Sequence, residues 1–183
     1  MKKLLAFSML FLLVFAAACG NDDSATGTKD ESEKKVDKTE LKSTLLDFQL
    51  EVTDVLKENH KPFAEFEAIK AQMNDSEVAE EEKPSKEEAQ SALDAAKEAG
   101  PKAAEALRGM EIPSELSQYE EDLQSALEDA AKSYEKRAET VSLEAAEDAQ
   151  AEADELFASF EEKFSKPFEN LDLLSPKFKT ELE

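Results

Sequence analysis

The sequence predicts an all-α protein: an elongated bundle of three long helices, arranged up-down-up, with a short C-terminal piece. From residue 39 onward, apolar residues recur at three- and four-residue steps, the period of a helix that packs on other helices. The 183 residues include only four glycines, and apolar and polar residues show no sustained alternation of the kind that strands require. Both observations favour helices over a sheet.

The first helix is predicted from residue 39 to residue 73. Thr39 is the expected N-cap, and Glu40 follows it in the first turn, where a negative charge is favourable. Pro62 lacks the backbone N–H that a helix interior uses, so we expect a kink, or a division near Asn59. The expected inward stripe consists of Leu41, Leu45, Phe48, Val52, Val55, Phe66, Ile69 and Met73.

A second helix is predicted to begin after a polar connection over residues 74–84. Ser85 and Glu88 stand at the spacing of a capping box, in which each side chain binds the other residue's backbone N–H. Gly100 and Pro101 predict a break or kink. The inward face is mostly alanine, which allows close approach to neighbouring helices, and consists of Ala89, Ala92, Leu93, Ala96, Ala99, Ala103 and Leu107.

The third and longest helix is predicted from residue 114 to residue 164, with Ser114 as its N-cap. Residues 140–142 have low helix propensity and indicate a bend. Its core positions are Leu116, Tyr119, Leu123, Leu127, Ala130, Tyr134, Ala138, Val141, Ala145, Ala149, Leu156, Phe160 and Phe164. The C-terminal piece is expected to pack through Phe168, Leu171, Leu174 and Phe178. An alternative is an extended coiled coil of the alanine-rich middle with a second copy of the chain.

The first residues have the organisation of an export signal. Lys2 and Lys3 precede an apolar run from Leu4 to Val14, and small residues then lead to Cys19. Roughly fifteen apolar residues are fewer than the about 20 that a membrane-spanning helix needs. We therefore expect a signal peptide over residues 1–18 that is removed by cleavage.

The chain's single cysteine ends this segment, and Ala16-Ala17-Ala18-Cys19 resembles the lipobox of bacterial lipoproteins. The commonest lipobox has leucine where this chain has Ala16. The resemblance implies that Cys19 receives diacylglycerol, that cleavage falls between Ala18 and Cys19, and that the mature protein is held on the membrane by its lipid. Two acyl chains give stable anchoring. The alternative is an ordinary secretory signal cut after Ala18, which would leave a free thiol.

Residues 19–38 are predicted to be a disordered acidic tether that carries the lipidated cysteine. The stretch is rich in glycine, serine, threonine and charge, and Val36 is its only large apolar residue. A flexible chain of this length spans roughly 25 Å. The helical domain then occupies residues 39–183.

The acidic balance restricts the partners of the protein. The 22 lysines and arginines, less Lys2 and Lys3, oppose 44 aspartates and glutamates, so the mature chain carries a net charge of −24. This charge argues against nucleic-acid binding and favours cations, cationic peptides or basic protein surfaces. Weak divalent-cation binding by residues 80–82 or 144–154 is one interpretation, but a solvated helix face is preferred, and no dedicated metal site is predicted.

The inventory of catalytic side chains predicts that the protein is not an enzyme and needs no cofactor. His60 is the only histidine, and lipid occupies Cys19 in the lipoprotein interpretation, which leaves little for nucleophilic or histidine-based zinc chemistry. His60 lies in a polar stretch and is interpreted as an exposed or capping residue. There is no glycine-rich phosphate loop.

Two functions remain. The first is a non-catalytic surface interaction or structural lipoprotein that contacts the cell wall or an extracytoplasmic protein. In layout the chain is similar to small helical lipoproteins of Gram-positive bacteria, some of them described as cell-wall-binding, which implies the outer face of a Gram-positive cell membrane. The second is a ligand-binding lipoprotein that holds a small apolar molecule or peptide. Its pocket would be lined at one bundle end by Phe63, Phe66, Phe157, Phe160, Phe164 and Phe168.

Overall fold

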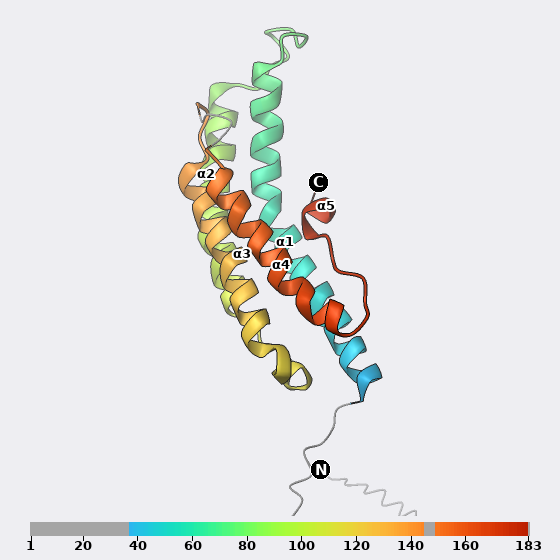
Figure 1. Cartoon of the computed structure of the whole chain (residues 1–183). Coiled ribbons are helices and arrows are strands. Elements are labelled where there is room, and N and C mark those ends of the chain that lie inside the picture. The colour runs from blue at the N-terminus through green and yellow to red at the C-terminus, as the bar shows by residue number, and fades with distance from the viewer. Residues whose placement is uncertain (1–36, 145–148, 183) are drawn as a thin grey trace, which may run out of the picture. The chain divides into compact units, whose positions relative to one another are not determined.

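The computed structural model describes residues 37–144 and 149–182, all within one compact unit of the chain (Figure 1). These residues form helices and contain no strand, which confirms the all-α prediction for this part of the protein. The elements are α1 (Lys38–Asn74), α2 (Lys86–Arg108), the 3-10 helix η1 (Ser114–Tyr119), α3 (Glu120–Thr140), α4 (Ala151–Asn170) and α5 (Phe178–Leu182). α2 packs against α1 and α3, and α3 packs against α4.

The predicted signal peptide over residues 1–18 and the cleavage site at Ala18 and Cys19 lie outside the described residues, as does nearly all of the segment predicted as a tether. They remain sequence predictions. Among the helices that are described, none has both the length and the apolar composition needed to cross a membrane.

α1 is one continuous helix of 37 residues. Asp37 caps it by accepting a 2.7 Å hydrogen bond from the backbone N–H of Thr39, so the predicted Thr39 N-cap is wrong by two positions. The predicted division before Pro62 does not occur. Leu56 and Phe63 are buried on either side of the proline, and this burial offsets the hydrogen bond that Pro62 cannot donate.

α2 begins with the predicted capping box. The backbone N–H of Ser85 donates to Glu88 Oε2 at 2.8 Å, and the backbone N–H of Glu88 donates to Ser85 Oγ at 3.2 Å. The predicted alanine face is confirmed, with Ala92 half-buried and the others buried. The small side chains on this face allow α2 to approach α1 and α3 closely.

The break predicted at Gly100 and Pro101 is wrong, because α2 continues through both residues. Gly100 instead serves packing. A Cβ atom at this position would lie 2.3 Å from the Cβ atom of Ala138 and 2.6 Å from the carbonyl oxygen of Tyr134, both in α3. The hydrogen on Gly100 therefore permits the close contact between α2 and α3.

The predicted third helix over residues 114–164 is divided in the structure. η1 takes its first turns, with Ser114 inside it rather than at a cap. α3 ends at Thr140, where Val141 turns extended at ψ 127° and buries its side chain, and α4 begins only at Ala151. Residues 140–142, which have low helix propensity, therefore end a helix rather than bend it. Their β-branched and hydroxyl side chains stabilise a helix poorly. Ser133 donates to the Ala153 carbonyl at 2.7 Å and joins α3 to α4.

Six phenylalanines from three helices form a group of contacting rings in the core, here called the phenylalanine cluster. Phe164 lies in the middle, with ring centroids 5.1 Å from Phe178, 5.7 Å from Phe160 and 6.0 Å from Phe48. The cluster consists of Phe48 (α1), Phe157, Phe160, Phe164 and Phe168 (α4) and Phe178 (α5). It fastens the C-terminal piece to α4 and α1.

Four residues were expected to pack the C-terminal piece. Phe168, Leu171 and Phe178 are buried as predicted, but Leu174 is 94% exposed, so its prediction is wrong. Asp172, the second residue after α4, lies in the left-handed region at φ 54°, and this turn carries the following residues away from a helical stripe.

Arg108 joins the end of α2 to α3. Its guanidinium donates to Glu128 at 2.8 Å and to Glu135 at 2.6 Å, and these hydrogen bonds raise the pKa of Arg108. We expect Arg108→Gln to lower the free energy of unfolding by about 1 kcal/mol, because partly exposed ion pairs are screened by water. Urea denaturation at low salt and at about 1 M NaCl should show a smaller difference at high salt. Equal differences at both salt concentrations would contradict an electrostatic contribution.

Candidate functional site

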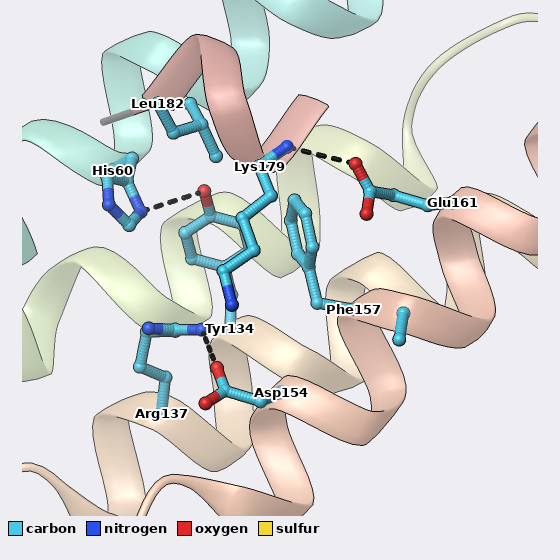
Figure 2. Close-up of a pocket in the computed structure, with 9 residues that line it drawn as sticks. His60, Tyr134, Arg137, Asp154, Phe157, Glu161, Lys179 and Leu182 are labelled. Carbon is cyan, nitrogen blue, oxygen red and sulfur yellow. Dashed lines mark hydrogen bonds and ion pairs between the residues drawn. The ribbon is translucent and has the colours of Figure 1, made fainter. Parts of the chain in front are cut away.

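A cleft of about 190 Å³ opens between α1, α3, α4 and α5, and we name it the His60 cleft (Figure 2). α1 contributes a histidine, and α3 contributes a tyrosine and an arginine. α4 contributes four residues, and α5 contributes two. The lining residues are His60, Tyr134, Arg137, Asp154, Phe157, Ala158, Glu161, Lys179 and Leu182. Charged, aromatic and aliphatic side chains therefore border one space.

Tyr134 forms the inner end of the cleft and is 1% exposed. Its hydroxyl group lies 3.4 Å from the carbonyl oxygen of Leu56 and 3.4 Å from His60 Nδ1. Both distances exceed the 2.7–2.8 Å typical of a hydroxyl hydrogen bond, so the hydroxyl group is held only weakly. Burial raises the pKa of the Tyr134 phenol, which keeps it a neutral donor.

His60 is half-buried among aromatic rings. Its ring centroid lies 6.3 Å from that of Phe63 and 6.2 Å from that of Tyr134. Burial lowers the pKa of His60, and the positive charge of Arg137 lowers it further. The imidazole is therefore neutral at pH 7, and the interpretation of His60 as an exposed or capping residue is wrong.

Two polar links hold the outer wall of the cleft. Arg137 Nη2 donates to Asp154 Oδ1 at 2.8 Å and joins α3 to α4. Glu161 Oε1 accepts the backbone N–H of Lys179 at 2.9 Å and joins α4 to α5. The cleft is lined by two positive side chains, Arg137 and Lys179, and two negative ones, Asp154 and Glu161. Their formal charges cancel, although the net charge of the chain is −22.

The structure does not place the six phenylalanines predicted for a pocket around one space. Phe157 alone among them borders the His60 cleft. The other five are between 0% and 3% exposed, because they fill the core between the helices rather than leaving room for a ligand. Phe63 packs on Tyr134, Phe66 lies under the Lys70 ammonium, and Phe160, Phe164 and Phe168 belong to the phenylalanine cluster.

The cleft brings together residues that the sequence patterns did not combine. His60 follows Leu56 by four residues and precedes Phe63 by three, so it continues the buried stripe of α1. Tyr134 and Arg137 stand three residues apart and share one face of α3. From these spacings, the sequence could have shown which residues share a helix face. The cleft itself could not be predicted, because it depends on where α5 packs.

The described part of the chain contains no group of side chains arranged as a metal site. Across residues 37–144 and 149–182, no three histidine, cysteine, aspartate or glutamate side chains are arranged to hold a metal ion. The predicted acidic segment over residues 144–154 is described only in part. The side chains that line the His60 cleft offer hydrogen bonds, apolar contact and charge.

Lowering the pH below 6.5 is expected to destabilise the protein through His60. Because burial lowers the pKa of His60 from its ordinary value of 6.5, the unfolded chain takes up this proton at a higher pH than the folded protein does. The stability linked to neutral His60 is complete above pH 6.5 and decreases below it. Urea denaturation from about pH 7.5 to about pH 5 measures this decrease.

The matched variant is His60→Gln, which cannot titrate and should show a flatter pH profile in that range. Carboxylates such as Glu128, whose pKa the hydrogen bond from Arg108 holds below 4.5, titrate at lower pH in both proteins. Parallel profiles for the two proteins above pH 5 would show that His60 does not resist protonation.

Comparison of the chain with protein-family models, with curated proteins and with solved structures finds no match. Any function assigned to the protein therefore depends on its own residues.

Proposed function

We propose that the protein is a lipid-anchored extracytoplasmic lipoprotein whose helical domain acts as a non-catalytic interaction or structural module. The observation that carries the proposal is the position of Cys19, the single cysteine, at the end of an apolar segment and directly after Ala16-Ala17-Ala18. An unused thiol in an exported protein would be a liability, and lipidation gives it a role. The outer face of a Gram-positive cell membrane is the proposed location.

The helical domain is compatible with this role. It starts at Lys38 behind the Asp37 cap, so 18 residues separate it from Cys19, enough for a tether of roughly 25 Å. Its core is well packed, and the shared faces of α1 with α2, α2 with α3 and α3 with α4 support a bundle of alternating helix directions. The up-down-up arrangement is part of the proposal.

The negative charge of the mature chain indicates which kinds of partner it can bind. The net charge of −24 that the mature chain would carry favours binding to a basic protein surface. Anionic cell-wall polymers would need bridging cations, for which the acidic helix faces offer oxygen ligands. An extracytoplasmic protein with a basic face is therefore the proposed partner, and the cell wall is the second.

A ligand-binding lipoprotein is the alternative, and one observation favours it. The His60 cleft has a volume of about 190 Å³ and is bordered by Phe157. The other five phenylalanines of the predicted pocket are buried in the core. A ligand-binding role would therefore use the His60 cleft rather than the bundle end that the sequence suggested.

Protease treatment of protoplasts tests the location. We expect protease added outside to degrade the helical domain while a cytoplasmic marker survives, because the domain lies on the outer face. Chemical crosslinking of the same cells should give a discrete adduct with a partner. Survival of the domain until the protoplasts are lysed would contradict the proposal, since it would place the domain inside the cell.

A further inference from the structure

The His60 cleft has apolar and polar side chains that face the same space (Figure 2). Phe157, 6% exposed, and Leu182 supply the apolar wall. The polar groups are the Tyr134 hydroxyl group beside the His60 ring and, away from these two, the Arg137 side chain beside Asp154. Pockets for small molecules combine the same two parts, an apolar lining and a few oriented polar groups.

Among the described residues, the polar side chains of the cleft have N–H and O–H donors that are not fully used. The Arg137 guanidinium has five N–H donors, and its ion pair with Asp154 engages Nη2. In the part of the chain that the structure describes, the Tyr134 hydroxyl group has two polar contacts, each of 3.4 Å. An acceptor placed at an ordinary hydrogen-bond distance would replace a weak contact of Tyr134 with a stronger one.

The charge of Arg137 favours an anion in the cleft. The Arg137 side chain is 22% exposed, whereas its partner Asp154 is 50% exposed. Water therefore screens the carboxylate more than the guanidinium, and the positive charge acts more strongly inside the cleft. A carboxylate ligand gains from this field, and an ammonium ligand loses.

The volume of the cleft suits a ligand with one ring. A cavity of about 150 Å³ accommodates benzene, and the His60 cleft measures about 190 Å³. We propose that the His60 cleft binds a small aromatic carboxylate. The ring lies against Phe157 and Leu182, and the carboxylate accepts hydrogen bonds from Arg137 and Tyr134. The inference goes beyond the proposed anchoring and does not depend on it.

α5 completes the site. Phe178 is buried in the phenylalanine cluster, Glu161 accepts the backbone N–H of Lys179, and Lys57 pairs with Glu181 at 3.3 Å. These three links hold Leu182 over the cleft. The short helix at the C-terminus is therefore a wall of the proposed site.

Benzoate titration of the full chain tests the proposal. His60 carries the only imidazole of the protein, so its ¹⁵N NMR signals report directly from the cleft. At a fixed pH near 7.5, where His60 is neutral, benzoate should shift these signals in a saturable way, with a Kd that is roughly millimolar or lower. Benzyl alcohol and benzylamine, which carry the same ring without the carboxylate, should bind at least about tenfold more weakly.

Three variants locate the binding. Arg137→Gln should raise the Kd for benzoate about tenfold, because it removes a charge-assisted hydrogen bond. Ala158→Leu introduces a larger side chain at an exposed position in the lining, and should block binding without disturbing the core. Arg108→Gln, an arginine outside the cleft, is the matched control and should leave the Kd unchanged.

Several results would overturn the proposal. One is the absence of a saturable His60 shift. Another is binding of benzylamine as tight as that of benzoate, and a third is an unchanged Kd in both folded Arg137→Gln and Ala158→Leu. Circular dichroism of each variant shows that it is folded, and Ala158→Leu keeps the test valid if Arg137→Gln unfolds.

Discussion

Phe164→Ala is expected to lower the free energy of unfolding by about 3–5 kcal/mol, the largest effect of any single substitution considered. Phe164 is fully buried, and its ring contacts those of Phe48, Phe160, Phe168 and Phe178. Because these rings come from α1, α4 and α5, they cannot all move to fill the space that the missing ring leaves. Urea denaturation followed by circular dichroism measures the loss.

Leu174→Ala is the matched control for removal of an apolar side chain. Leu174 lies in the same C-terminal part of the chain but is 94% exposed, so its truncation should change stability by less than about 0.5 kcal/mol. Similar losses for Phe164→Ala and Leu174→Ala would contradict the burial of Phe164 in the phenylalanine cluster.

Gly100→Ala is expected to lower the free energy of unfolding by about 1–3 kcal/mol, although alanine normally stabilises a helix interior. The added Cβ atom would meet Ala138 at 2.3 Å and the Tyr134 carbonyl oxygen at 2.6 Å. The second of these contacts is with backbone, which cannot rotate away, so α2 and α3 must separate. Thermal denaturation of the variant measures the cost.

Two further variants isolate this clash. Gly109→Ala places its Cβ atom 3.2 Å from the Glu105 carbonyl oxygen of its own helix end, so it should have a much smaller effect. Ala138→Gly in the Gly100→Ala background removes the shorter contact and should restore part of the loss. A Gly100→Ala protein as stable as the wild type would show that α2 and α3 do not approach closely at this point.

Local signals identified most of the helices. The apolar period placed α1 and α2, and the spacing of Ser85 and Glu88 placed the start of α2. These features depend on side chains three or four residues apart, and such spacings are visible in any helical sequence. The alanine face of α2 was predictable for the same reason.

Helix continuity was harder to predict because it depends on tertiary packing. Pro62 and the Gly100-Pro101 pair indicated breaks, yet burial around them keeps α1 and α2 continuous. The opposite error concerned residues 140–150. Ala145 and Ala149 continued the three- and four-residue spacing of the predicted helix. The chain nevertheless leaves the helix at Val141.

The candidate site was only partly predictable. Spacing indicated that Tyr134 faces inward, and it does. Spacing placed Leu156 on the inward stripe, but its neighbour Phe157 is the buried residue. Spacing does not show whether rings fill the interior or leave a space, because that depends on the position of α5 and Phe178. His60 was misinterpreted because its polar neighbours in sequence concealed its place on the buried stripe of α1.

Intact-mass measurement of the natively expressed protein tests the lipid anchor most directly, with membrane partitioning compared between the wild type and Cys19→Ala. The proposal predicts that the wild type starts at Cys19, carries the mass of a diacylglyceryl group and stays with the membrane fraction. It predicts that Cys19→Ala is neither lipidated nor processed at this site. An unmodified wild-type chain, cut after Ala18 and free in the medium, would contradict the lipid anchor and identify a secreted binding protein instead.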